Sequence, residues 1–382
     1  MNAAIAYYIT AHGYGHGVRS TDIIRAINRL YPEINVHIIT GLPAPFLRSR
    51  LGADNISIRV RDFDIGMVQL DSIRVDVAAT LDRALELYAA RERLLAEEIV
   101  FLEETGINMV VTDIPSLPLE AAAQAGIPRA AVGNFSWDWI YSEFLTEDAR
   151  WLPIVEMFRE QYSRSDLLLR LPFHDEMTAF PVKEDIPLVA HPGNPCRDRI
   201  ARLTGCDPEK KWVLLSFTTL DLSEEALARI ERIKDREFLT VLPLQWRRSN
   251  IHAVEREQAS FSDVLASVDA VISKPGFGIL SDCVVNHKPL IYADRTNFRE
   301  YPVLEESIRK YLKHVHISTE DLYRGDIESS LRAVETAAEP LLSLPAGGDE
   351  IAARHIVKRF YTRERKHFPC MREDYCRKAR KD

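Results

Sequence analysis

Two histidines and three glycines crowd one short stretch between a strand-like and a helix-like segment. The stretch reads HGYGHG and contains His12, Gly13, Gly15, His16 and Gly17. A connection that only turns the chain needs fewer glycines, so this loop is suited to a ligand that approaches the backbone. Free N–H groups at a helix N-terminus favour an anion, or a hydroxyl that develops negative charge. The glycines do not have GxGxxG spacing, and a tight turn with incidental histidines is the alternative.

A second loop of this kind lies in the other half of the chain, in ISKPGFGILSD, residues 272 to 282. Gly276 and Gly278 would let a diphosphate reach the N-terminus of the helix that follows, and Lys274 adds a cation there. Asp282 falls early in that helix, where a carboxylate can accept hydrogen bonds from a ribose diol. A pure turn needs none of these residues in this order, so we expect a nucleotide to bind here.

Strand-like apolar runs alternate with helical patterns along the chain, which is typical of parallel α/β sheets. In the first half we expect strands at 3–10, 35–40, 107–113, 128–134 and 165–172, and helices at 18–30, 77–104 and 117–126. In the second half we expect strands at 211–217, 237–243, 269–273 and 288–293, and helices at 223–234, 261–268 and 278–286. The fold class is therefore α/β, with two doubly wound, Rossmann-like domains that face a central cleft.

The domain boundaries follow from a change in composition. Residues 172 to 210 contain six prolines and two cysteines without helical periodicity. We therefore expect an N-terminal domain at 1–180, a Pro-rich linker at 181–210 and a nucleotide-binding domain at 211–350. Residues 351–382 would form a C-terminal helix and a basic tail.

Bulk properties exclude several classes of protein. A chain of 382 residues is long for a single core, so about two domains are expected. Its net charge of −8 argues against nucleic acid or an anionic membrane as the main partner. No apolar run is long enough for a transmembrane helix, and no signal peptide is expected. The five scattered cysteines indicate free thiols in a reducing cytoplasm. The oligomeric state stays open.

The two loops and several further segments resemble the nucleotide-sugar glycosyltransferases of the GT-B fold. The resemblance is to the N-terminal, glycosyltransferase-like region of plant L-arabinokinases in particular. It rests on YYITAHGYGHGVRS, MVVTDIPSLPLEAAAQAGIP, GNFSWDWIYSEF, LLLRLP and SKPGFGILSD, in that order. The sugar-kinase module of those plant proteins has no counterpart here, so no kinase activity is expected.

The resemblance implies a general base. In many GT-B transferases a histidine of the first loop deprotonates the acceptor hydroxyl, and in the plant natural-product branch an aspartate orients it. His16 matches that histidine, and Asp113, at the end of MVVTD, matches the aspartate. A hydroxyl acceptor needs a base that works near neutral pH, and a carboxylate fixes the imidazole tautomer. Asp113 could instead only cap the helix that follows it, and His12 is the weaker candidate for the base.

The donor side departs from the family pattern at several points. The usual Gly-Gly or Gly-Ser pair is Thr218-Thr219 here, the usual hydroxyl residue is Ile279, and the usual glutamate is the shorter aspartate. Arg295 and Glu300 match positions near the donor sugar, although a structural ion pair is the alternative. The donor-binding residues that the resemblance implies are Thr218, Lys274, Gly276, Phe277, Gly278, Asp282, Arg295 and Glu300.

The aromatic segment NFSWDWIYSEF allows two interpretations. Trp137, Ile140, Tyr141 and Phe144 recur at helical spacing, which usually indicates a core face. An aromatic residue beside a carboxylate can also hold a sugar ring. The residues assigned to the acceptor or phosphate loop are His12, Gly13, Gly15, Gly17, Arg19, Trp137 and Asp138.

Together these features predict a glycosyltransferase that moves a sugar from a nucleoside diphosphate, UDP rather than GDP, to a hydroxyl acceptor. The acceptor would be a small molecule or a glycan. The reaction would be metal-independent because no DxD motif follows a strand, and the nucleotide sugar would be a co-substrate, with no cofactor. The alternatives are a non-catalytic nucleotide-sugar-binding protein and a GT-B-type nucleotide-sugar 2-epimerase.

Overall fold

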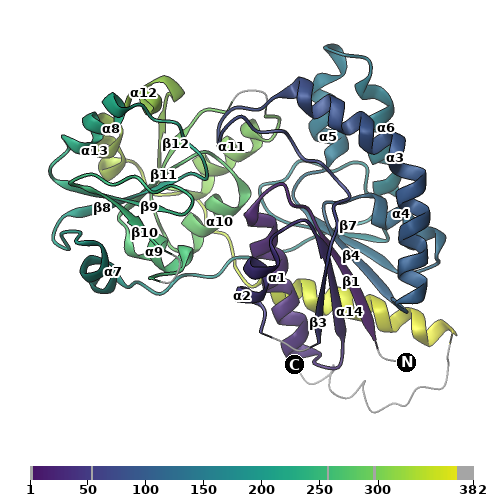
Figure 1. Cartoon of the computed structure of the whole chain (residues 1–382). Helices are drawn as coiled ribbons and strands as arrows, with labels where there is room; N and C mark the ends of the chain where they lie inside the picture. Colours follow the sequence, from purple (N-terminus) through teal and green to yellow (C-terminus); the bar gives the residue numbers. More distant parts are fainter. Residues whose placement is uncertain (1–2, 53–54, 256–257, 296–297, 368–382) are drawn as a thin grey trace.

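The structure is a computed structural model that describes residues 3–52, 55–255, 258–295 and 298–367. Two parallel sheets, each covered by helices, stand side by side, with the first half of the chain on the right in Figure 1. The predicted α/β class is confirmed. The predicted basic tail beyond His367 lies outside the described residues.

The first sheet has the strand order β3-β2-β1-β4-β5-β6-β7, and all its pairs are parallel. Its strands are β1 Ala4–Ile9, β2 Asn35–Thr40, β3 Ile56–Val60, β4 Met109–Asp113, β5 Arg129–Gly133, β6 Leu167–Arg170 and β7 Lys183–Asp185. The helices of this half are α1 Tyr14–Leu30, α2 Ala44–Arg50, α3 Val77–Glu104, α4 Leu117–Gln124, α5 Trp137–Tyr141 and α6 Trp151–Ser163, with a 3₁₀ helix at Ser142–Thr146.

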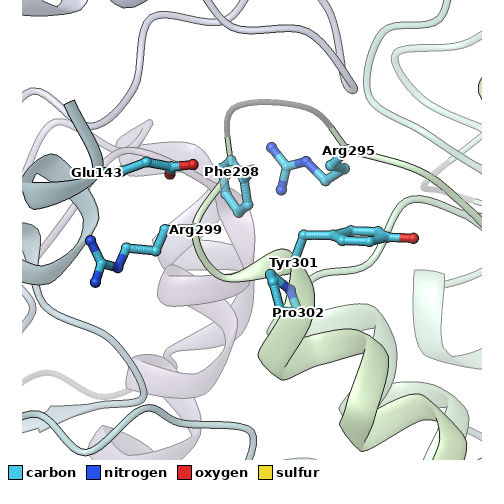
Figure 2. A pocket seen from close by; sticks show the side chains of 6 residues that line it. All are labelled: Glu143, Arg295, Phe298, Arg299, Tyr301 and Pro302. Atoms are coloured by element: carbon cyan, nitrogen blue, oxygen red, sulfur yellow. The ribbon is translucent and has the colours of Figure 1, made fainter. Parts of the chain in front are cut away.

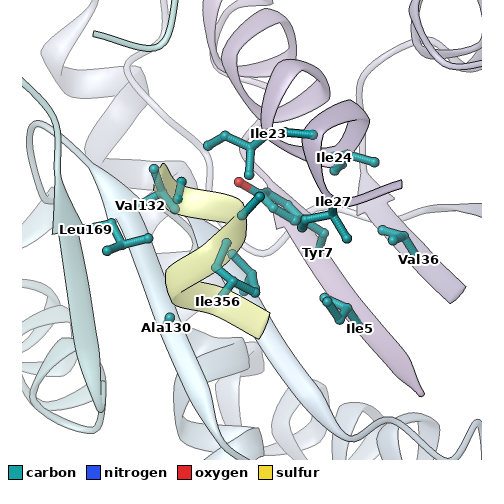
Figure 3. Close-up of a cluster of buried hydrophobic side chains, with 14 of the residues drawn as sticks. Ile5, Tyr7, Ile23, Ile24, Ile27, Val36, Ala130, Val132, Leu169 and Ile356 are labelled. Carbon is teal, nitrogen blue, oxygen red and sulfur yellow. The ribbon is translucent and has the colours of Figure 1, made fainter. Parts of the chain in front are cut away.

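The central strands explain why this sheet forms. Strands β1 and β4 are buried along their whole length, as expected for parallel strands covered on both faces. Helix α1 turns Ile23, Ile24 and Ile27 toward Ile5 and Tyr7 of β1, as Figure 3 shows. The register places Ile9 opposite Asp113, so both strands end at the same edge of the sheet. That edge carries the first glycine loop.

The second sheet has the order β10-β9-β8-β11-β12-β13 and is also parallel. Its strands are β8 Lys211–Ser216, β9 Arg236–Val241, β10 Ile251–Val254, β11 Ala270–Ser273, β12 Leu290–Ala293 and β13 His314–Ile317. Its helices are α7 Arg197–Thr204, α8 Glu224–Glu231, α9 Phe261–Ser267, α10 Phe277–Val285, α11 Tyr301–Tyr311, α12 Thr319–Arg324 and α13 Glu328–Thr336. Strands β8 and β11 are neighbours, so the Thr218-Thr219 segment and the second glycine loop follow adjacent strands.

The structure corrects one expectation about the predicted linker, residues 181–210. The range was expected to lack a helix, yet it contains α7, and the short strand β7 adds to the first sheet. Helix α7 is short and polar and buries only Ile200 along its length, so the sequence shows too few apolar residues there to indicate a helix. Gly205, at φ +80°, ends the helix in the left-handed conformation that glycine adopts readily.

The last helix returns to the first half. Helix α14, Gly348–His367, packs Ala352, Ala353, Ile356 and Val357 into the core formed by β1 and α1. Figure 1 shows it in yellow below the first sheet. None of the helices in the described ranges combines the length and apolar character needed to cross a membrane.

Candidate active site

The two glycine loops meet at the junction of the two halves. A Cβ atom added to Gly278 would lie 3.7 Å from the Cα of Gly15, so the backbones approach closely. Helix α1 starts after Gly13 and helix α10 after Gly276, and both capping glycines border open space. The positive ends of two helix dipoles therefore point into one place, which favours an anionic ligand.

His16 and Asp113 lie in hydrogen-bond contact beside this junction. The Nδ1 atom of His16 is 2.9 Å from Oδ1 of Asp113, which ends β4. Arg19 Nη2 lies 3.0 Å from the same Nδ1 atom but donates to Asp113 Oδ1 at the shorter distance of 2.6 Å, and the carboxylate can only accept, so we assign the proton to Nδ1. The Nε2 atom then carries the lone pair, and no hydrogen bond to it occurs within the described residues. The geometry suits a base whose tautomer is held by a carboxylate.

Arg19 holds the same carboxylate from the other side. Its Nε atom donates to Oδ2 of Asp113 at 2.7 Å, and its Nη2 atom donates to Oδ1 at 2.6 Å. The Ser20 hydroxyl donates to Oδ2 at 2.7 Å as well. Burial alone would raise the pKa of Asp113, but the charge and hydrogen bonds of Arg19 hold it well below its ordinary value. Asp113 is therefore a fixed anion.

The electrostatics of His16 follow from this arrangement. Burial, and next the Arg19 guanidinium, lower the pKa of His16 from its ordinary 6.5, and Asp113 opposes them only in part. The imidazole is consequently neutral near pH 7, with its lone pair free to accept a proton. It is also a weaker base than an unperturbed histidine.

A chain of hydrogen bonds links this pair to the second half. Arg19 Nη1 donates to Oδ1 of Asn134 at 2.9 Å, and Asn134 Nδ2 donates to Oε1 of Glu300 at 3.4 Å. Glu300 caps helix α11 and is buried. Burial raises its pKa to about 7, although the charges of Arg295 and Arg19 oppose the shift. Glu300 of the second half is thus connected to Arg19 of the first half through Asn134.

The second half adds two basic side chains, Lys274 and Arg295, near the carboxyl group of Glu300. Burial, and then the charge of Arg295, hold the pKa of Lys274 well below its ordinary value, and the charges of Asp71 and Glu300 oppose the shift. Burial likewise lowers the pKa of Arg295 to about 10 against the charge of Glu300, and its Nε atom has no hydrogen-bond partner in the described part of the chain. An unpartnered buried donor favours a ligand that accepts a hydrogen bond.

A pocket of about 340 Å³ opens next to Arg295. Figure 2 shows Arg295, Phe298 and Tyr301 on one side and Glu143 of the first half across from them. The guanidinium of Arg295 stacks on the Phe298 ring, which fixes its direction. The pocket is therefore built from both halves and is rich in charged groups; its lining residues are Glu143, Arg295, Phe298, Arg299, Tyr301 and Pro302.

His12 is a buried neutral imidazole. Its Nδ1 atom accepts from the Met67 N–H at 3.3 Å, so its proton resides on Nε2. Burial, followed by the charges of His16, Lys274 and Arg295, lowers its pKa to about 3. Gly66 has φ +63°, and a Cβ there would come 2.2 Å from His12 Nδ1. His12 can donate a hydrogen bond but cannot serve as a base that titrates near neutral pH.

A segment of the first half, around Ser72, forms hydrogen bonds with the loop that follows strand β8. Ser72 Oγ accepts from the N–H groups of Thr218 and Thr219 at 3.2 and 2.9 Å. The Ser72 N–H donates to the Thr219 carbonyl at 3.1 Å. The family resemblance places a diphosphate near these N–H groups, and here a serine hydroxyl of this chain satisfies them.

Several residues that were expected to contact a ligand pack in the protein interior instead. Arg19 is 2% exposed and fully engaged with Asp113 and Asn134, so it does not line the open side of the loop. Gly17 faces Phe46 and Leu42, where a Cβ would lie 2.6 and 2.7 Å away, which gives it a packing role.

Trp137 is likewise an interior residue. It is 1% exposed, stacks on Tyr141 and donates from Nε1 to Asp64 Oδ2 at 2.9 Å, so the core interpretation of its spacing applies. Asp138 is also buried, and its Oδ1 atom has no partner within the described residues.

Two of the expected donor residues, Asp282 and Phe277, lie against helix α1 of the first half. Asp282 lies where α10 meets α1, and burial, then the charge of Asp22, raise its pKa to about 7. Phe277 packs under the Arg19 guanidinium, 4.8 Å from ring centre to Cζ. Their contacts with a nucleotide stay predictions.

The sequence analysis missed Asn134, Gly66, Asp64 and Ser72. Asn134 directly follows β5 in GNFSW, at the same sheet edge as Asp113, and that position was its available signal. Ser72 lies in a polar loop without any motif, and only the tertiary contact with Thr218 reveals it.

Comparison with known proteins identifies one relative in sequence and several solved structures with a similar fold. No family model matches the chain. The chain is 30% identical over 371 residues to L-arabinokinase of Arabidopsis thaliana, which covers 92% of this chain and 34% of that protein. The chain thus spans about a third of the length of this curated relative.

Solved structures agree on the architecture. The crystal structure of Arabidopsis thaliana UGT89C1 complexed with quercetin has a TM-score of 0.60 at 14% identity, covering 94% of this chain and 100% of that one. The glycosyltransferase of kitacinnamycin has a TM-score of 0.59 at 15% identity, covering 93% and 98%. Phytolacca americana UGT2 complexed with UDP-2-fluoro-glucose and pterostilbene has a TM-score of 0.57 at 13% identity, covering 95% of both chains. The chain has the GT-B fold of glycosyltransferases and is similar in sequence to a plant L-arabinokinase.

Proposed function

We propose that this protein transfers a sugar from a nucleoside diphosphate to a hydroxyl group, with His16 as the general base. The observation that carries the proposal is the 2.9 Å contact between His16 Nδ1 and Asp113, beside the junction of two glycine loops. A non-catalytic binding site needs no histidine whose tautomer is held by a fixed carboxylate. The GT-B fold and the glycosyltransferases similar to it support the same reaction class.

On the acceptor side, His16 Nε2 takes the proton of the attacking hydroxyl. The Asp113 carboxylate stabilises the imidazolium that forms, and Arg19 and Ser20 keep that carboxylate from moving. Preorganised groups of this kind need no rearrangement when charge develops. The acceptor is a small molecule or a glycan with a free hydroxyl.

On the donor side, the leaving diphosphate accumulates negative charge. We propose that Lys274 and the N-terminus of α10 meet this charge without a divalent cation, since the sequence lacks a DxD motif. Arg295 and Glu300 lie near each other at the same cleft and are assigned to the sugar. UDP is favoured over GDP because a solved protein of this fold holds UDP-2-fluoro-glucose.

The cellular setting belongs to the proposal as well. Cys196, Cys206 and Cys283 are free thiols. Unpaired cysteines are typical of proteins in a reducing compartment. We therefore propose that the enzyme works in the cytoplasm.

The decisive experiment combines nucleotide binding with turnover. Wild-type protein is screened for thermal shifts with nucleoside diphosphates and nucleotide sugars, and donor hydrolysis or transfer is measured on each hit. We expect His16→Ala to lower turnover about 10²–10⁴-fold while UDP affinity is unchanged. His37→Ala, a half-buried histidine on β2, is the matched control and retains activity. Full activity of His16→Ala would refute the assignment.

One observation favours a second candidate, a nucleotide-sugar-binding protein without catalysis. Ser72 already satisfies the Thr218 and Thr219 N–H groups that the family uses for the diphosphate. A ligand at 100 times its dissociation constant stabilises a protein by about 2.7 kcal/mol, which a thermal-shift screen detects. A shift without hydrolysis or transfer over many acceptors would select this candidate.

A further inference from the structure

A cluster of metal-ligating side chains lies in the second half, away from the cleft. The thiol of Cys206, the carboxylate of Glu237 and the imidazole of His252 place one ligand atom each within 4.8 Å of one another. The side chain of Glu237 is 4% exposed and that of His252 is 12% exposed. Cys206 is also buried. Thiolate, carboxylate and imidazole groups are the ligand types that zinc uses in proteins.

Rigid elements hold the three side chains. Glu237 lies on β9 and His252 on the adjacent parallel strand β10, where His252 is paired with Leu239. Cys206 directly follows Gly205, whose left-handed conformation ends helix α7. The cluster therefore joins two strands and a helix terminus, and a ligand set built on such elements is preorganised.

The hydrogen bonds of His252 give the ring a defined orientation. Its Nδ1 atom lies 3.1 Å from the Thr204 carbonyl, and its Nε2 atom lies 2.7 Å from Oε2 of Glu237. The carbonyl accepts the Nδ1 proton, so Nε2 faces the carboxylate and the neighbouring thiol. Metal-bound histidines typically donate their other N–H to a backbone carbonyl in this manner.

We propose that Cys206, Glu237 and His252 bind one Zn²⁺ ion, with water in the remaining position. Zinc prefers thiolate and imidazole ligands and accepts a carboxylate, and one thiolate plus one carboxylate balance its charge. The ion is held by the thiolate of Cys206, a carboxylate oxygen of Glu237 and the Nε2 lone pair of His252, so binding releases protons from the ligands.

Two neighbouring groups contact the proposed ligands. The Thr204 hydroxyl donates to the Cys206 sulfur at 3.1 Å. Lys210 Nζ lies 2.8 Å from Oε1 of Glu237, which leaves Oε2 to the ion. The Lys210 side chain is 34% exposed, so its charge remains solvated when an ion binds. Without metal, the side chains of Lys210 and His252 both contact the Glu237 carboxylate.

The site has a structural role and is independent of the proposed sugar transfer. Glu237 lies at the start of β9, whereas the cleft is at the carboxyl ends of the strands. Strand β10 is at the edge of the second sheet, and α7 lies within the predicted linker. A bound ion would tie this helix to the sheet edge and stabilise the second half.

The test is metal titration of the full-length protein after treatment with a chelator. We expect one equivalent of Zn²⁺ to bind and to raise the melting temperature. Co²⁺ should give the visible bands of a four-coordinate site and a near-ultraviolet sulfur-to-cobalt band. Cys206→Ser should lose that band and weaken Zn²⁺ binding more than about 100-fold, beyond a typical outer-sphere change. Cys196→Ser, which removes a half-buried thiol outside the cluster, is the matched control and binds as the wild type.

The cobalt spectrum is read on the wild-type chain, so the result does not depend on the folding of a variant. Absence of a saturable site, or Co²⁺ binding without a sulfur band, overturns the proposal. Equal Zn²⁺ affinity of Cys206→Ser and the wild type overturns it as well. Loss of sugar transfer in the His16 experiment leaves the metal site unaffected.

Discussion

At the scale of single residues, Arg19 changes the chemistry of the His16–Asp113 pair. A carboxylate alone raises the pKa of a neighbouring histidine, because it stabilises the imidazolium. Here two guanidinium nitrogens of Arg19 bind both oxygens of Asp113, and burial together with the Arg19 charge lowers the pKa of His16. The pair therefore keeps its orientation while the histidine stays unprotonated near neutral pH.

This arrangement predicts the pH dependence of the base. Because the pKa of His16 lies below 6.5, activity should fall only as pH drops under that value. Arg19→Gln removes the positive charge but keeps an amide donor, so the pKa of His16 should rise and the acid limb should move to higher pH. Histidine NMR titration measures this without a known substrate.

His12 serves as an internal control in the same spectra. The pKa of His12 is lowered to about 3, so His12 should not titrate between pH 5 and 8. The titration of His16 in Arg19→Gln is followed over that same pH range. An unchanged His16 titration in Arg19→Gln would contradict the role given to Arg19. Circular dichroism must accompany the measurement, since breaking a buried ion pair costs about 3–5 kcal/mol.

At the scale of elements, the hairpin at 68–76 links the two halves. Ile73 is 2% exposed and packs in the core of the second half, although it belongs to the first half by sequence. Asp71 Oδ2 accepts from the Tyr323 hydroxyl at 2.7 Å, and Ser72 binds the Thr218 and Thr219 backbone. The hairpin thus fixes the width of the cleft at the end of β8.

We expect Tyr323→Phe to loosen this hairpin. The variant removes one hydrogen bond to a buried carboxylate, which costs about 1.5–3 kcal/mol when the acceptor is charged. Amide hydrogen exchange at 70–76 should become faster while exchange in β1 and β4 is unchanged. Tyr311→Phe on α11 removes a hydroxyl in a core cluster that contains no residue of the hairpin, and it serves as the control. Unaltered exchange at 70–76 in Tyr323→Phe would show that the hairpin is held by packing of Ile73 alone.

At the scale of the whole molecule, each half contributes a segment to the other. The hairpin carries Ile73 into the second core, and α14 carries Ile356 and Val357 into the first core. Figure 1 shows α14 returning beneath the first sheet after the chain leaves the second half. Segments exchanged in both directions couple the folding of the two domains.

The coupling predicts one cooperative unfolding transition. Ile356→Ala removes a fully buried side chain and should lower the free energy of unfolding by about 2–5 kcal/mol. Urea unfolding followed by tryptophan fluorescence reports on both halves, through Trp137 and Trp151 in the first and Trp212 in the second. Leu341→Ala, at a side chain that is 83% exposed, is the control and should change little. Two separate transitions in the wild type would mean that the halves fold independently.

The pattern of the sequence was sufficient for the architecture and for both glycine loops. Strand and helix periodicity are local, and a glycine cluster between a strand and a helix marks the ligand-binding edge of a parallel sheet. The family resemblance identified His16 and Asp113, which the structure places in contact. These features depend on neighbours in the chain or on matching motifs, so they are visible without coordinates.

Only the tertiary structure decided which side chains meet. Asp113 binds Arg19 because strand order places β4 beside β1, whose loop leads into α1. The same order directs Arg19 and Trp137 to the interior, although both were expected at a ligand. Ser72 contacts Thr218, and Cys206 lies beside His252. These residues are far apart in the sequence, so the periodicity of helices and strands does not predict that they meet. Contacts between residues far apart in sequence depend on the packing of whole elements, and that packing is absent from any short window of the chain.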